Sequence, residues 1–148
     1  MNTRRMSAVL FSLALVLALL GRADAASKTE IKGAAILDHP CGKVAVKHMD
    51  LVHAGKMAEA TKLGTKAMQD GWQAMPAKDR DMMSGMMKEM SVSGAQFAND
   101  IKSSGLLAVD GTAVSLTVTR QHKDANGSST ETWKQDYVLD KGACLITR

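Results

Sequence analysis

Aromatic side chains are scarce in this chain, at 3% of its 148 residues. The four that lie beyond the first twenty-five residues stand singly, at Trp72, Phe97, Trp133 and Tyr137. Lysines and acidic residues are interspersed along the same stretch, so the sequence offers neither a basic stripe that would follow phosphates nor an aromatic platform on which bases would stack. We therefore expect no nucleic-acid binding.

Long hydrophobic runs are equally few, and the single one lies near the N-terminus. Two arginines precede an apolar run from Ala8 to Leu20, and Ala23-Asp24-Ala25 then places small residues where signal peptidase reads the chain. This order is typical of a secretory signal peptide over residues 1–25, cleaved before Ala26. A run of thirteen residues is too short to cross a hydrocarbon core of roughly 30 Å. We expect a periplasmic or secreted protein with no membrane anchor after cleavage.

Cleavage would leave 123 residues, the size of one ordinary domain. The formal charge would fall from +4 to +2, because three arginines and one aspartate leave with the signal peptide. Residues 26–40 are expected to form a lead-in segment with one short strand, and residues 41–148 a single domain.

Cysteine is limited to two residues, Cys41 and Cys144. Thiols oxidise in exported compartments, so the pair predicts one disulfide. It would close a loop of about a hundred residues and contribute on the order of 4–5 kcal/mol in the chain-entropy model. The alternative is a reactive or metal-binding thiol at Cys41, which is predicted to lie at a helix N-terminus where the thiolate is favoured.

Hydrophobic periodicity predicts helices in the first half of the domain. Apolar positions share one face from about Cys41, after His39-Pro40, to a C-terminal cap at Gly55. A second helical stretch is predicted over Met57 to Met68, followed by a loop from Gln69 to Met75. Pro76 suits the first turn of a third helix, which runs to about Met90.

Alternating residues replace this pattern in the second half. The predicted strands cover residues 113–119, 129–139 and 143–147. Turn residues flank them at Asp110-Gly111, Asn126-Gly127 and Asp140-Lys141-Gly142. Helices followed by an antiparallel sheet predict an α+β domain.

Methionine is concentrated in Asp81 to Met90, which holds five of the nine methionines beyond the predicted signal peptide. On a helix these five share one face: Met82, Met83, Met86, Met87 and Met90. The simplest interpretation is a core-facing helix, because methionine fills irregular apolar gaps. The alternatives are a ligand cavity or an adaptable binding groove, and a copper(I) site that uses Met82, Met86 and His48, since thioethers select soft metals.

His48 lies within the apolar arc of the first predicted helix, which is typical of a hydrogen-bonded interior residue. The sequence contains no nucleophile elbow, phosphate loop, His-Glu-x-x-His helix or pair of Cys-x-x-Cys motifs. We therefore assign no catalytic residue and no cofactor.

The segment Ala45-Val46-Lys47-His48-Met49-Asp50-Leu51-Val52-His53-Ala54-Gly55-Lys56-Met57 resembles the first helix and turn of the nuclear transport factor two-like superfamily. The Pro76 helix and the later strand pair are similar to small exported members of this superfamily. The resemblance implies helices packed in the concave face of a bent antiparallel sheet, forming a cone with an apolar pocket. It also implies that a homodimer is reasonable, because open sheet faces in this superfamily often pair.

Ketosteroid isomerase-like members of the superfamily use an acidic base with a tyrosine and a neutral carboxylic acid. This chain has one tyrosine, Tyr137, and no carboxylate on the apolar face of the first predicted helix. We therefore expect a non-catalytic binding or accessory domain with a cavity for a small hydrophobic ligand or a partner segment. The cavity is expected to be lined by His48, Met49, Val52, Met83, Met87 and Trp133. The alternatives are a periplasmic copper(I)-binding protein and a small isomerase or lyase with His48 as general base.

Overall fold

The structure is a computed structural model that describes residues 27–124 and 127–147. Five α-helices and two 3₁₀ helices are formed by the described residues: η2 Gly33–Asp38, α1 Pro40–His53, α2 Met57–Ala60, η3 Thr61–Leu63, α3 Lys66–Ala74, α4 Ala77–Met90 and α5 Gly94–Ser104. The strands are β1 Thr29–Lys32, β2 Leu106–Asp110, β3 Ala113–Asp124, β4 Gly127–Asp140 and β5 Ala143–Ile146.

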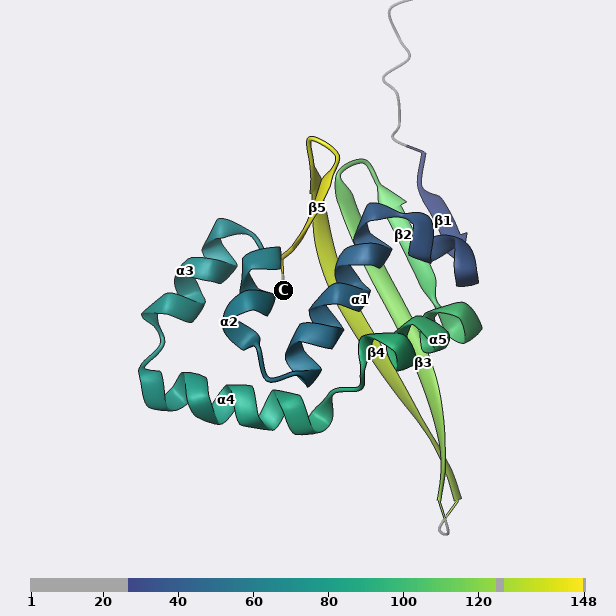
Figure 1. The fold of residues 1–148 in the computed structure, drawn as a ribbon. Coiled ribbons are helices and arrows are strands. Elements are labelled where there is room, and N and C mark those ends of the chain that lie inside the picture. The colour runs from purple at the N-terminus through teal and green to yellow at the C-terminus, as the bar shows by residue number, and fades with distance from the viewer. Residues whose placement is uncertain (1–26, 125–126, 148) are drawn as a thin grey trace, which may run out of the picture.

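The strands form one antiparallel sheet in the order β1-β2-β3-β4-β5. Helices α1 and α5 pack against this sheet, while α3 and α4 lie further from it (Figure 1). The predicted α+β class is confirmed. The bent, cone-like curvature stays a prediction.

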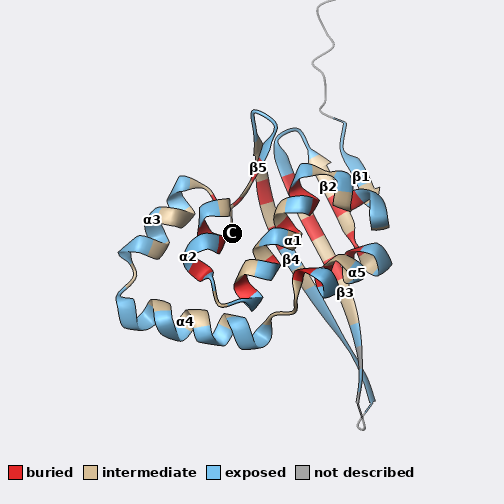
Figure 2. Cartoon of the chain, in the orientation of Figure 1, coloured by how far each residue is buried: buried red, intermediate tan, exposed pale blue. Residues whose placement is uncertain are grey.

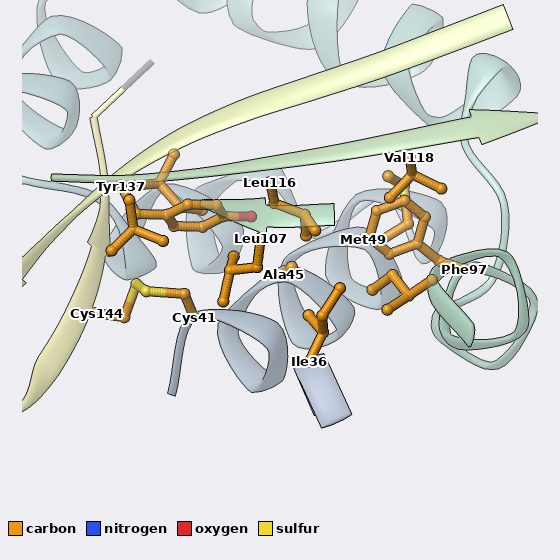
Figure 3. Close-up of a cluster of buried hydrophobic side chains, with 13 residues drawn as sticks. Ile36, Cys41, Ala45, Met49, Phe97, Leu107, Leu116, Val118, Tyr137 and Cys144 are labelled. Atoms are coloured by element: carbon orange, nitrogen blue, oxygen red, sulfur yellow. A yellow bond between two sulfur atoms is a disulfide. The ribbon is translucent and has the colours of Figure 1, made fainter. Parts of the chain in front are cut away.

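The main core lies between this sheet and the helices α1 and α5 (Figure 3). It contains Phe97 and Ile101 from α5, Ala45 and Met49 from α1, and the inward-facing residues of the strands. On β3 these are Val114, Leu116 and Val118, the alternating set that the sequence indicates. Period-two alternation therefore identified the covered face of this strand correctly.

Cys41 and Cys144 form a disulfide, with their Cα atoms 5.1 Å apart. Both residues are buried in the main core, and neither is a free thiol. The predicted disulfide is confirmed, and the alternative of a reactive or metal-binding thiol at Cys41 is wrong because the sulfur is already bonded.

Helix α1 begins and ends close to the predicted residues. The backbone N–H of Cys41 donates a hydrogen bond to Nδ1 of His39 at 3.1 Å, and Pro40 occupies the first turn. A proline there costs no hydrogen bond, because the first N–H groups of a helix have no partner within it. After the helix, Gly55 adopts a φ of +74°, the left-handed conformation that glycine tolerates.

The predicted loop from Gln69 to Met75 is wrong, because α3 covers most of it. The break in the helices comes earlier, at Gly64 and Thr65. Gly64 forms a parallel bridge with Ile146, and the N–H of Thr65 donates to the carbonyl of Ile146 at 2.9 Å. Pairing with a strand at the far end of the chain is a tertiary contact, which local periodicity does not reveal.

Helix α5 and strand β2 have no counterpart among the predicted elements. Ser93 caps α5 by accepting a hydrogen bond from the N–H of Gln96 at 3.2 Å. Further along the helix, Nε of Arg120 on β3 donates to the Asp100 carboxylate at 2.5 Å. The guanidinium carbon of Arg120 also lies 5.8 Å from the centre of the Phe97 ring. These contacts hold α5 against the sheet.

The lead-in segment contains the expected short strand, β1, which pairs with β2. Ile36, from the 3₁₀ helix that follows it, is fully buried in the main core. The segment therefore packs with the rest of the domain.

Strands β3 and β4 form a long hairpin that extends beyond the helices (Figure 1). Its ladder ends at the pair Asp124 and Gly127, and Asn126 of the predicted turn lies outside the described residues. The next hairpin turns at Lys141 and Gly142, which both have positive φ values, as a tight two-residue hairpin turn requires. The predicted turn at this place is confirmed.

Candidate functional site

The six residues expected to line one cavity belong to different parts of the structure. Met49 is in the main core, and Trp133 packs edge-on against Phe97 with the ring centres 4.8 Å apart. Val52 belongs to a second cluster with Met57 and Ala60, against which Met87 packs. The other two residues, His48 and Met83, are half-buried.

The surface formed by residues 27–124 and 127–147 includes the following three hollows. The first, of about 640 Å³, lies between α5 and β3, and the second, of about 550 Å³, between α1 and α5. The third, of about 460 Å³, lies among α2, α3 and α4. None of these three is lined by any of the six predicted residues.

His48 is half-buried on α1. Burial lowers the pKa of its imidazole, which keeps the ring neutral. The residue lines none of these three hollows. A general base at His48 stays a prediction.

The methionines of α4 provide the most distinctive surface. No residue of α4 is buried (Figure 2). The exposed fractions of Met82, Met86 and Met90 are 68%, 52% and 74%, whereas Met49 in the main core is 7% exposed. The prediction of a core-facing methionine stripe is therefore wrong for these three residues. We call them the methionine face.

Residues beside the methionine face attach α4 to the molecule. Met87 packs against the Val52 cluster, and the Ser84 hydroxyl donates to the carbonyl of Gly55 at 3.3 Å. Nδ1 of His53 lies 3.2 Å from the carbonyl oxygen of Ser91, just after the helix. The helix is thus held along one side, which leaves the methionine face uncovered by the described part of the chain.

The third hollow adjoins this helix. Its apolar wall includes Met57 and Trp72, and its polar wall includes Arg80, Asp81 and Ser84, which belong to α4. This hollow was not predicted, because Trp72 falls within the predicted loop from Gln69 to Met75. The apolar residues of α3 have a helical spacing, but Gly71 within the helix weakens that signal.

The described residues contain no group of three or more histidine, cysteine, aspartate or glutamate side chains that could hold a metal ion. The ligands of hard and borderline metals are therefore not gathered at one place in this part of the chain. Methionine is not one of these four residue types, so this absence does not concern the thioethers of α4.

No helix in the described part of the chain has both the length and the apolar character needed to span a membrane. Comparisons with protein-family models, with curated proteins and with solved structures gave no match.

Proposed function

We propose that this protein is an exported, non-catalytic binding domain that presents the methionine face of α4 to an apolar segment of a partner protein. One observation carries the proposal. Met82, Met86 and Met90 are the exposed large hydrophobic residues of the described chain, and they follow one another at every fourth position of one helix. Single exposed apolar residues are common on protein surfaces, but an aligned group is a feature of interaction sites.

Methionine suits such a surface because its unbranched side chain adapts to partners of different shape. The neighbouring hollow adds a recess with Trp72 on its wall. Aromatic residues at the edge of a recess commonly provide a large share of binding energy. An apolar helix of the partner could lie along α4 and place one large side chain in the hollow.

The disulfide supports an extracellular or periplasmic location for this binding, because such bonds persist in oxidising compartments. The resemblance to nuclear transport factor two-like domains is compatible with a binding role, although domains of one fold serve many functions. The proposal therefore rests on the surface of α4 and not on the resemblance.

Photo-crosslinking in the periplasm of the native cell tests the proposal. A photoreactive phenylalanine analogue replaces Met86 in one variant and the exposed Ser129 of the β3–β4 hairpin in a control variant. We expect a discrete adduct from position 86 and none from position 129, because only α4 would touch the partner. The mass of the adduct distinguishes a different protein from a second copy of this chain.

Two results would contradict the proposal: no adduct from position 86, or the same adducts from both positions. A thermal-shift series with small hydrophobic molecules examines the alternative of a small ligand. Stabilisation by such a molecule that persists in the Met86→Glu variant would place the ligand away from the methionine face.

A further inference from the structure

The methionine face also places three soft metal ligands next to one another on the exposed surface of α4. Met82, Met86 and Met90 are spaced four residues apart on α4. Residues at this spacing have Cβ atoms about 5–6 Å apart, and methionine has three rotatable side-chain bonds. Neighbouring thioethers on this line can therefore converge on a single ion.

Met86 holds the central position in this arrangement. Met90 follows Met82 by eight residues, which corresponds to about 12 Å along the helix axis. Long side chains on a helix all lean toward its N-terminus, so this common lean does not shorten the separation between Met82 and Met90. The two outer thioethers therefore meet a common ion only together with Met86. Each productive pair, Met82 with Met86 or Met86 with Met90, contains the central residue.

The chemistry of the described residues favours a soft, low-valent ion. Thioether sulfur selects copper(I), and carboxylates and water suit harder ions. The two cysteine sulfurs are joined in a buried disulfide, so they supply no competing thiolate. A thioether also carries no proton that must leave before it binds, unlike a thiol or an imidazolium.

We propose that the methionine face is a copper(I) site that binds one ion, with the Met86 thioether as the shared ligand. The site requires only this chain and the ion, so its test needs no partner, although a bound partner and the ion would use the same three side chains. It differs from the copper site expected from the sequence, which included His48. His48 is half-buried on α1, whereas the three thioethers are exposed on α4.

Titration of the full mature chain with copper(I), without oxygen and against a copper(I)-selective chelator, measures the affinity. Silver(I), a redox-inert analogue, serves as a second probe, and the methionine methyl groups are labelled with ¹³C. We expect binding of one ion per chain, with chemical-shift changes at the methyl groups of Met82, Met86 and Met90. Unchanged methyl resonances at these residues, or no competition with the chelator, would overturn the proposal.

Leucine variants separate the exposed thioethers from the half-buried ones on the same helix. Leucine matches methionine closely in volume and helix propensity, so both variants should fold. The Met82→Leu/Met86→Leu/Met90→Leu variant should lose binding, while the control Met83→Leu/Met87→Leu variant should keep it. Retained binding in the first, or an equal loss in the second, would place the ion elsewhere.

Single variants test the central role of Met86. Mutation of a residue that only hydrogen-bonds to a metal ligand typically lowers the metal affinity by about 10- to 100-fold. Loss of a direct ligand should lower the affinity at least as much. Met86→Leu should therefore weaken binding by roughly tenfold or more, and Met82→Leu should weaken it less. The reverse order would contradict the shared ligand.

The dependence on pH gives a further readout. Affinity measured with silver(I) should be the same at pH 5 and pH 7.5, because thioethers do not titrate. A large loss at pH 5 would show that an imidazole or a carboxylate carries the binding, and would overturn a thioether site.

Discussion

The hydroxyl of Tyr137 lies inside the main core without a hydrogen-bond partner among the described residues. In Figure 3 it is drawn among Leu107, Leu116 and Ala45, which all belong to the same apolar cluster. Burial raises the pKa of the phenol well above its usual range, and the nearby Asp136 carboxylate raises it further. The hydroxyl therefore stays protonated in the folded protein, and its desolvation opposes folding.

The substitution Tyr137→Phe should stabilise the protein. An unsatisfied buried polar group costs about 1–3 kcal/mol, and phenylalanine keeps the ring while removing that group. We expect the free energy of unfolding to rise by about 1 kcal/mol in urea titrations near neutral pH. A loss of stability would instead show that the hydroxyl is well hydrogen-bonded.

The same substitution should change the response to alkali. The pKa of tyrosine is about 10 in an unfolded chain, and it is higher in the folded protein. The folded state therefore retains a proton that the unfolded state loses, and the stability falls as the pH rises above about 10. Tyr137→Phe should lack this part of the alkaline decline.

Single residues also show how far the site could be predicted. The disulfide followed from two cysteines and an export signal, since no other partner was available. The side of α4 that carries the methionines was predicted as well. Its exposure was not, because helical periodicity identifies an apolar face without showing whether another element covers it. Met82 and Met87 are equivalent in the pattern, yet only Met87 meets the Val52 cluster.

At the scale of elements, α4 contains a glycine in its middle without a steric reason for it. A Cβ built on Gly85 would meet no atom within 4 Å. We predict that Gly85→Ala raises the free energy of unfolding by roughly 0.5–1 kcal/mol, because alanine loses less backbone entropy in a helix. Chemical denaturation measures the change.

Gly42 in α1 provides the contrasting control. A Cβ at this position would overlap the carbonyl oxygen of Ile36, so the backbone would have to move. Gly42→Ala should therefore destabilise the protein, although both glycines are helical. Similar effects of the two substitutions would show that helix propensity alone, and not packing, controls them.

The start of α1 should be sensitive to acid. Nδ1 of His39 accepts the N–H of Cys41, which it can do only while that nitrogen carries no proton. Burial lowers the pKa of His39, so its contribution is present above the unfolded value near 6.5 and is lost as the pH falls through the folded value. The contribution is on the order of 1 kcal/mol or less, as for other N-caps.

His39→Asn tests this cap with a side chain that does not titrate. Urea midpoints at pH 7.5 and pH 5 should differ less in the variant than in the unmodified protein. An equal difference in both would mean that other groups, among them His48 with its lowered pKa, account for the acid sensitivity.

Elements with local start and stop signals could be predicted, and those fixed by distant contacts could not. Pro40 and Gly55 bracket α1, and turn residues precede β5. By contrast, the break before α3 depends on Ile146, which is eighty-two residues beyond Gly64. Strand β2 was obscured because it adjoins α5 directly, with only Gly105 between them.

At the scale of the whole molecule, the disulfide joins the first turn of α1 to the last strand, with 103 residues of separation. Replacing both cysteines by alanine should lower the free energy of unfolding by about 4–5 kcal/mol in the chain-entropy model. Calorimetry or denaturant titration of the oxidised protein and the double variant measures the difference. A change below about 1 kcal/mol would indicate that the unfolded chain is compact without the bond.

The position of this bond also decides what a protease can release. Helices α1 to α5 and most of the sheet lie between Cys41 and Cys144, so they belong to one closed covalent ring. A single cut between α3 and α4 would open the ring without separating the molecule into two pieces. The methionine face would stay attached to the sheet, and the nick would appear on a gel only after reduction.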